Sequence, residues 1–137
     1  MNNDKRRKRY DWSSVLMLIA LITLMVSGYY VSRKRVRLKE ASSLPFHEID
    51  LNQIADGEYE GKTYTSFLHL QLKVIVENHK LKDIQVLENK GYDAETALPI
   101  IDKMIEQNSV VVPAVKGSEI GSLVYISCVS MALYGNH

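Results

Sequence analysis

The sequence is poor in the residues that cross-link small proteins or bind metals: its 137 residues include one cysteine and four histidines. The single cysteine, Cys128, cannot form a disulfide within the chain, so a disulfide-stapled secreted scaffold is excluded. Because Cys128 lies in an apolar stretch with helical spacing, we interpret it as a small buried hydrophobic residue. No metal site is predicted, because the histidines are scattered without a second ligand at zinc spacing. They are His47, His69, His79 and His137.

The common catalytic motifs are also missing. The chain contains no P-loop and no glycine-rich dinucleotide fingerprint. Ser118, Ser122 and Ser127 have no evident basic partner that would activate a hydroxyl. Glu58 and Glu60 share one face of a predicted strand, where paired carboxylates are normally solvated surface. No catalytic residue is therefore predicted, and a hydrolase or transferase finds no support.

The small net charge of +1 hides an asymmetry along the chain. Residues 1–40 hold ten Lys or Arg and three Asp or Glu, a net charge of +7. Residues 41–137 hold seven basic and thirteen acidic residues, a net charge of −6. The basic part suits anionic lipid headgroups. The acidic part argues against nucleic acid as a partner.

One long hydrophobic run stands out in residues 12–31, which contain no charge. At about 1.5 Å rise per residue, about twenty helical residues span the roughly 30 Å hydrocarbon core of a bilayer. Trp12 and Tyr29 lie near its two ends, at the depth that amphipathic rings prefer. A cleaved signal peptide fits less well, since basic residues 33–39 follow where a small-residue cleavage site is needed. We predict a retained single-pass anchor that contacts membrane lipid through residues 12–31, after a basic tail in residues 1–11.

The flanking charges leave the membrane orientation open. Five basic residues precede the span and five follow it closely, which is a tie under the positive-inside rule. Long domains translocate largely regardless of charge, so a cytoplasmic N-terminus is mildly favoured. The chain is thus expected in the cell membrane with its C-terminal domain outside the cytoplasm.

A basic, serine-rich linker is predicted for residues 32–45, and a folded domain for residues 46–137. Strands are expected at 56–64, 67–76 and 81–88, with a tight turn at 77–80 between the last two. The second strand alternates cleanly, so one face should be buried and should carry Leu68, Leu70, Leu72, Val74 and Val76. Its other face carries His69, Gln71 and Lys73. This pattern predicts an antiparallel meander with one buried face.

Helical spacing follows the strands. A helix is predicted for residues 93–107, with Asp93 as N-cap and a kink or restart at Pro99. Residues 108–115 should cross the edge of the core as an extended segment. A last helix over 122–133 places Leu123, Ile126, Val129 and Leu133 on one stripe. The predicted class is α+β: a small antiparallel sheet of three or more strands with two or more helices, preceded by one transmembrane helix.

The loop at residues 116–122 is the best candidate for a binding site. Gly117 and Gly121 allow close backbone approach, Ser118 and Ser122 supply hydroxyls, and Lys116 supplies a positive charge. A helix that starts just after the loop would aim its free N–H groups at an anion such as a phosphate. The alternative is an ordinary helix cap, since Gly/Ser loops before helices are commonly just that. Glu119 counts against a phosphate, because like charges repel.

The order of these features resembles the FMN-binding domain family over roughly residues 49–134. The resemblance is carried by "DLNQIADGEYEG", "LKVIVENHKLKDIQVLENKG" and "IIDKMIEQNSVVVPAVKGS", followed by a closing helix. The family includes small membrane-anchored bacterial flavoproteins and domains of membrane-bound electron-transfer complexes. The resemblance implies an FMN phosphate attached to the threonine of a Ser-Gly-Ala-Thr motif, and electron transfer outside the cytoplasmic membrane with a possible membrane redox partner.

Laid on this sequence, the motif falls on Lys116, Gly117, Ser118 and Glu119, so only the glycine is kept. A glutamate lacks the hydroxyl that a phosphoester needs, so attachment at that position is chemically excluded. Ser118, one residue away, is an alternative attachment point but lies one backbone position off. The main expectation is FMN held for electron transfer without a covalent bond, with Ser122 also near its phosphate. The alternative is loss of FMN, which would leave a flavin-free accessory or protein-interaction module that keeps the fold. Either way, an electron-transfer or binding protein is favoured over a stand-alone enzyme.

Overall fold

The computed structural model describes residues 11–134, so residues 1–10 of the predicted basic tail and residues 135–137 lie outside the described part. Its elements follow in the order α1 (Trp12–Ser42), η1 (Leu51–Gln53), β1 (Gly57–Tyr64), β2 (Leu68–Glu77), β3 (Lys80–Gly91), α2 (Pro99–Gln107) and α3 (Glu119–Leu133). A three-stranded antiparallel sheet combined with helices confirms the predicted α+β class.

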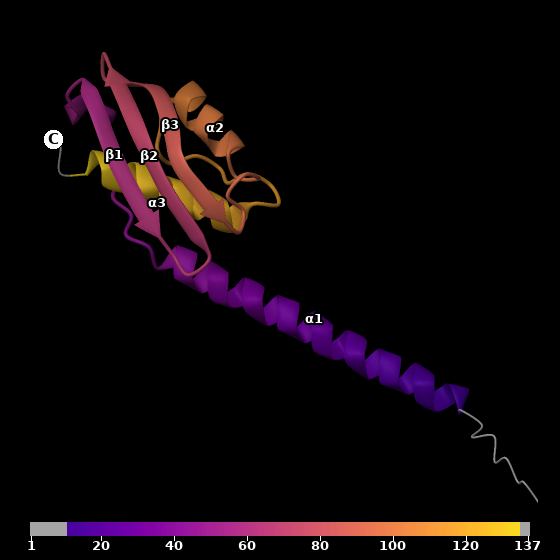
Figure 1. Ribbon diagram of the computed structural model, residues 1–137. Coiled ribbons are helices and arrows are strands. Elements are labelled where there is room, and N and C mark those ends of the chain that lie inside the picture. The colour runs from indigo at the N-terminus through magenta and orange to yellow at the C-terminus, as the bar shows by residue number, and fades with distance from the viewer. Residues whose placement is uncertain (1–10, 135–137) are drawn as a thin grey trace, which may run out of the picture. The chain divides into compact units, whose positions relative to one another are not determined.

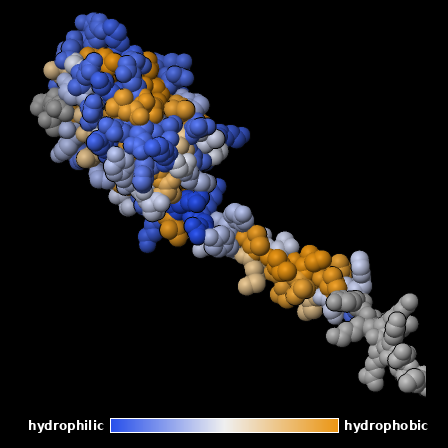
Figure 2. All heavy atoms as spheres, in the orientation of Figure 1, coloured by the Kyte–Doolittle hydropathy of each residue, from blue (hydrophilic) through white to orange (hydrophobic). Residues whose placement is uncertain are grey.

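Helix α1 contains the predicted membrane span. It is long and apolar enough to cross a membrane, and Figure 2 shows hydrophobic side chains covering the surface of its apolar part. Large side chains there are exposed, among them Leu24 at 70% and Met25 at 76%. The helix continues to Ser42, so most of the segment interpreted as a linker is helical. Among residues 11–134, no side chains cover this apolar surface, which is what a helix that lies in lipid requires.

The chain divides into two compact units, Met1–Val36 and Arg37–His137. The second unit therefore begins within α1 and includes nine residues before the predicted domain start at residue 46. Local packing explains the earlier start. Ala41 is buried, and the carboxylate of Glu40 accepts hydrogen bonds from the backbone N–H and the hydroxyl of Ser66, at 2.7 and 2.5 Å. The end of α1 is thus part of the folded domain.

The sheet is a meander in the order β1-β2-β3. The predicted alternation in β2 is confirmed, because its five even-numbered aliphatic side chains are all buried. Asn78 and His79 join β2 to β3 with φ of 54° and 58°, as a two-residue type I′ hairpin turn requires. The carboxylate of Asp56 accepts a hydrogen bond from the His79 N–H. Backbone hydrogen bonds from Asn78 and His79 hold the pKa of Asp56 below its usual value.

The predicted helix over 93–107 is wrong in its first six residues. Helix α2 begins at Pro99, which is where the predicted restart fell. Asp93 is no N-cap, since its φ of 60° lies in the left-handed region. Residues 92–98 form hydrogen-bonded turns, including the Ala97 N–H to Asp93 C=O bond at 3.1 Å. Proline clashes with the preceding turn inside a helix but suits its first position, so a helix that begins at residue 99 avoids the clash.

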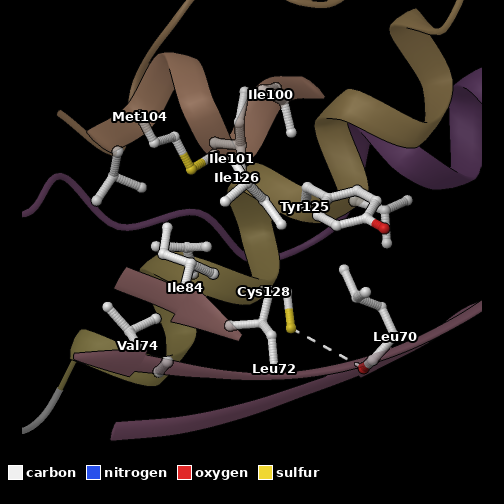
Figure 3. Packing of buried hydrophobic residues seen from close by; sticks show 14 of the residues in the cluster. Leu70, Leu72, Val74, Ile84, Ile100, Ile101, Met104, Tyr125, Ile126 and Cys128 are labelled. Carbon is white, nitrogen blue, oxygen red and sulfur yellow. Dashed lines mark hydrogen bonds between the residues drawn. The ribbon is translucent and has the colours of Figure 1, made fainter. Parts of the chain in front are cut away.

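Helix α3 starts three residues earlier than predicted, so residues 119–121 are helical. Twelve of its fifteen residues are buried, whereas a single apolar stripe was predicted, and Leu123 of that stripe is only partly buried. The reason is that protein surrounds the helix. Figure 1 shows α3 behind the sheet and α2 beside β3. Figure 3 shows Tyr125 and Ile126 of α3 between the sheet and the α2 side chains.

Before α3, the segment over 108–115 forms no helix or strand. Val110 and Val112 are buried while Val111 is 57% exposed. This alternation brings the chain along the core edge to the loop that precedes α3.

Candidate functional site

The candidate loop is built on a tight turn. The Ser118 N–H donates to the Val115 C=O at 2.9 Å, and Gly117, the third residue of the turn, has φ of 86°. A positive φ at this position is typical of a type II turn and favours glycine. A Cβ on Gly117 would have no atom within 4 Å. Glycine is thus needed here for its backbone conformation and not for close packing.

Ser122 is turned into the protein and not toward a ligand. Its side chain is fully buried. The hydroxyl donates to the Ser118 C=O at 2.7 Å and accepts from the Val115 N–H at 3.0 Å. A hydroxyl has one proton to donate, and here the loop itself receives it. Ser122 therefore pins the loop to α3.

Ser118 precedes α3 as its N-cap residue and is 4% exposed. Its side chain makes no capping hydrogen bond to the helix. Lys116 is exposed, and none of the salt bridges recorded within residues 11–134 includes it. The two residues thus differ in access: the cation faces water, while the serine is largely covered.

Glu119, at the place of the family's threonine, turns its carboxylate back onto the loop. It is the first residue of α3 and is exposed. One carboxylate oxygen accepts a hydrogen bond from the Gly117 N–H at 3.1 Å. That N–H is a donor that a phosphate in this loop would use. The chain thus places its own anion at this amide.

A second carboxylate, Asp93, reaches α3 from a distant part of the chain. Its Oδ2 lies 3.4 Å from the Gly121 N, in the first turn of α3. Its other oxygen accepts from the Thr96 hydroxyl at 3.3 Å. A Cβ on Gly121 would lie 2.6 Å from the Asp93 Cβ and 2.9 Å from the Ala97 Cβ. Glycine is required at 121 for this close approach, which brings a negative charge to the positive end of the helix dipole.

Sequence reasoning missed the role of Asp93 and assigned it to a helix cap instead. The available signal was Gly121, which marks a close backbone contact without naming the partner. The structure brings Lys116, Gly117, Ser118, Glu119 and Ser122 together around the start of α3. Two carboxylates meet amides there: Glu119 accepts from the Gly117 N–H of the loop, and Asp93 accepts from the Gly121 N–H in the first turn of α3.

A shallow pocket of about 270 Å³ lies beside the turn that carries Asp93. Its lining includes two carboxylates and no basic side chain. Ligand pockets for drug-sized molecules usually have about 300–1,000 Å³, so this one is small for an organic cofactor. It is lined by Asn89, Gly91, Asp93, Ala94, Glu95 and Thr96.

A buried tyrosine fixes the inner wall of this pocket. The Tyr125 hydroxyl donates to the Ala94 C=O at 2.8 Å, and the side-chain amide of Asn89 donates to the same carbonyl at 3.3 Å. Burial raises the pKa of Tyr125 above its usual value. The hydroxyl therefore keeps its proton at neutral pH and acts as a structural donor.

The described histidines lie apart from this loop. His79 Nδ1 is 3.0 Å from the Ile54 C=O, His47 stacks on Tyr134, and His69 lies beside Tyr64. No group of three metal-ligating side chains occurs within residues 11–134. His137 lies outside the described residues.

No family model, no curated protein and no solved structure matches this chain. The resemblance to the FMN-binding domain family therefore stays a prediction.

Proposed function

We propose that this chain is a membrane-anchored module of the FMN-binding-domain type that works without flavin, as an accessory or protein-interaction partner of membrane redox proteins. The observation that carries the proposal is the hydrogen bond from the Gly117 N–H to the Glu119 carboxylate at 3.1 Å. The group that should bear the FMN phosphate is replaced by an anion that occupies a donor of the phosphate loop. The residues present do not fit a covalently attached FMN.

Three further features of the loop support the same conclusion. The Ser122 hydroxyl already makes two hydrogen bonds within the loop. Asp93 adds a second carboxylate at the N-terminal end of α3. The adjoining pocket is small and carries acidic side chains. A phosphate at this place would meet two like charges against one cation, Lys116, which is an unfavourable balance.

FMN held without a covalent bond is the second candidate. It is favoured by the exposed Lys116 and by the open space around Gly117, both at the N-terminal end of α3. In this case Glu119 must move away from the Gly117 N–H to admit the phosphate. The isoalloxazine ring would then supply the redox chemistry, and the protein would supply position.

A visible spectrum separates the two candidates. The full chain would be purified in detergent from its native host, exchanged into fresh buffer and then titrated with FMN. The first proposal expects no flavin absorbance after purification and no quenching of FMN fluorescence during the titration. Flavin absorbance that persists through buffer exchange, or saturable quenching, overturns it in favour of the second.

Two neutral variants test the role assigned to Glu119. Glu119→Gln removes the charge at the Gly117 N–H, while Glu95→Gln removes an exposed charge from the neighbouring pocket and serves as the matched control. Binding of FMN or inorganic phosphate by Glu119→Gln alone would identify the Glu119 carboxylate as the group that excludes phosphate. Absence of binding in all three proteins would leave the flavin-free proposal standing but remove Glu119 as its cause.

The proposed location is the cell membrane, with the domain outside the cytoplasm. Helix α1, which is long and apolar enough to span a membrane, supports this location. Protease treatment of intact cells tests the orientation. Loss of the domain from intact cells is expected, and protection until the cells are broken would place it inside.

A further inference from the structure

The last residues of α1, from Arg37 onward, pack as part of the folded domain. Besides the bonds between Glu40 and Ser66, the Arg37 guanidinium lies 4.1 Å from the centre of the Tyr92 ring. Ala41, on the same stretch of helix, is buried. The turn between β1 and β2 therefore lies beside the C-terminal end of α1, as Figure 1 shows.

This end of the domain is confined near the bilayer. Arg37 is the sixth residue after Val31, which closes the uncharged run. Even a fully extended chain rises only about 3.6 Å per residue, so Arg37 lies within about 22 Å of the end of that run. The bound depends only on chain length and holds for any placement of the domain relative to the apolar part of α1.

The same end presents a row of aromatic and basic side chains across the outer face of the sheet. Tyr64 pairs in register with His69, and His69 pairs with Lys90. The Tyr64 ring is 56% exposed and lies 5.1 Å from the His69 ring. The Lys90 side chain is 78% exposed, 3.5 Å from the Glu88 carboxylate. Amphipathic rings and lysines of this kind are the side chains that lie at headgroup depth in membrane proteins.

The basic residues next to the domain are concentrated at the end of it that adjoins α1. Basic residues 33–39 lead into it, whereas residues 41–137 carry a net charge of −6. The end next to α1 also holds carboxylates, and the attraction to an anionic surface therefore comes from the basic run 33–39 and from Lys90. These carboxylates are Glu40, Glu88, Asp93 and Glu95. The other end of the sheet, at the β2–β3 turn, carries Asp56, Glu77 and Asp83 beside its lysines.

We propose that the row Tyr64–His69–Lys90, together with Arg37 and Lys39, docks the domain on anionic phospholipid headgroups of the membrane that α1 crosses. The inference rests on the proposed membrane anchoring but does not depend on whether FMN binds. Docking fixes which face of the domain is turned to the bilayer.

Fluorescence quenching by headgroup spin-labelled lipid tests this docking. Trp12 is the only tryptophan, so a Trp12→Tyr, Tyr64→Trp chain reports from the row alone. The full chain would be reconstituted in nanodiscs of phosphatidylcholine with or without phosphatidylglycerol. Quenching is expected to be stronger in the anionic discs and to fall to the zwitterionic level in about 1 M salt, where the screening length is about 3 Å.

Two lysines on β3 give a matched pair of charge reversals in this reporter chain. Lys90→Glu lies in the proposed surface, and Lys80→Glu makes the same charge change at the far end of the strand. A cation near an anionic surface is worth about fivefold in occupancy, so Lys90→Glu should lower the docked-to-free ratio about fivefold or more. Lys80→Glu should leave it unchanged. Both positions are exposed, and equal thermal melts would show that both variants fold.

Equal quenching in the two lipids, or equal loss in the two variants, overturns the docking proposal. Strong quenching that ignores salt also overturns it, because the tether alone would then hold the reporter near the surface. Failure of the chain to elute with the nanodiscs tests a different claim, the membrane anchoring on which the docking proposal rests. That result would sink membrane anchoring itself.

Discussion

Helices α1 and α3 are both apolar, yet protein covers only one of them. Between residues 12 and 31, α1 leaves its large side chains exposed, whereas α3 buries twelve of fifteen residues. Helix α3 is surrounded by the sheet, α2 and the segment around Pro45, whose carbonyl accepts from the Ser127 hydroxyl at 2.6 Å. An all-round apolar helix must leave water, and its neighbours decide whether lipid or protein replaces that water.

Small residues mark the protein-covered helix. A Cβ on Gly61 of β1 would lie 2.5 Å from the Cys128 C=O and 2.9 Å from the Ala132 Cβ, so sheet and helix are in close contact. In α1, a Cβ on Gly28 would have no atom within 4 Å. The comparison teaches that a glycine next to an apolar helix has a packing role where a second backbone approaches it.

We expect the largest difference between α3 and α1 when a charged residue is introduced into each helix. Val129→Asp places a carboxylate among fully buried side chains of α3 and should cost about 4 kcal/mol or more, enough to unfold the domain. Leu24→Asp in α1 should leave the thermal melt of the domain unchanged. It should instead weaken membrane insertion by about 2.5–3.5 kcal/mol. Circular dichroism and carbonate extraction measure the two effects, and a native-like melt for Val129→Asp would contradict the comparison.

The next largest difference between the two helices should be the reactivity of a thiol placed in each. Burial raises the pKa of Cys128 to about 11 from an ordinary 9.0, which lowers its thiolate fraction at neutral pH about a hundredfold. Alkylation of the native chain should therefore be slow and should speed up as pH rises toward 11. A second thiol at Ser32→Cys, in exposed α1, gives an internal control in the same molecule. Mass spectrometry of the two labelled peptides measures the ratio, and equal labelling rates would show that α3 opens readily.

Two glycines test the packing difference directly. Gly121→Ala pushes a methyl group against Asp93 and Ala97 and should destabilise the domain by about 1–3 kcal/mol. Gly28→Ala meets open space and favours the helix, so it should leave the domain as stable as before. Chemical denaturation of both variants gives the free energies of unfolding. Equal values would refute the close contact at Gly121.

The smallest expected effect concerns side-chain hydroxyls. Ser127→Ala removes the hydrogen bond to the Pro45 C=O and should cost about 1 kcal/mol. Thr23→Val removes the corresponding bond to the Ile19 C=O within α1 and should not change domain stability. Chemical denaturation measures the free energy of unfolding of both variants. A decrease in Thr23→Val as large as that in Ser127→Ala would contradict the different surroundings of α1 and α3.

Much of the fold was predictable because short-range chemistry governs it. Alternation with period two predicted the buried face of β2, and the uncharged run predicted α1. The missed parts are those where several weak local signals compete. Residues 93–98 have helical spacing, but Pro99 and the left-handed Asp93 turn the chain instead. The sequence predicts the start of α3 three residues late, because glycine and serine around Glu119 are typical of a loop, whereas residues 119–121 are helical.

The position of the candidate site in the chain was predictable, but the groups that meet there were not. The Gly/Ser loop before the last helix was located from its residues alone. The Asp93 carboxylate comes from 28 residues away, and no periodicity connects it to Gly121.

By itself, the sequence determined that one helix needs a non-aqueous environment, that three strands form a meander, and that the candidate phosphoester position has no hydroxyl. Only the tertiary structure decided that α3 is buried on nearly every side and that carboxylates meet the amides at its start. The physical reason is the separation along the chain of the residues that interact. Hydropathy, strand alternation and the absence of a functional group are properties of neighbouring residues, whereas burial and charge compensation depend on segments that folding brings together.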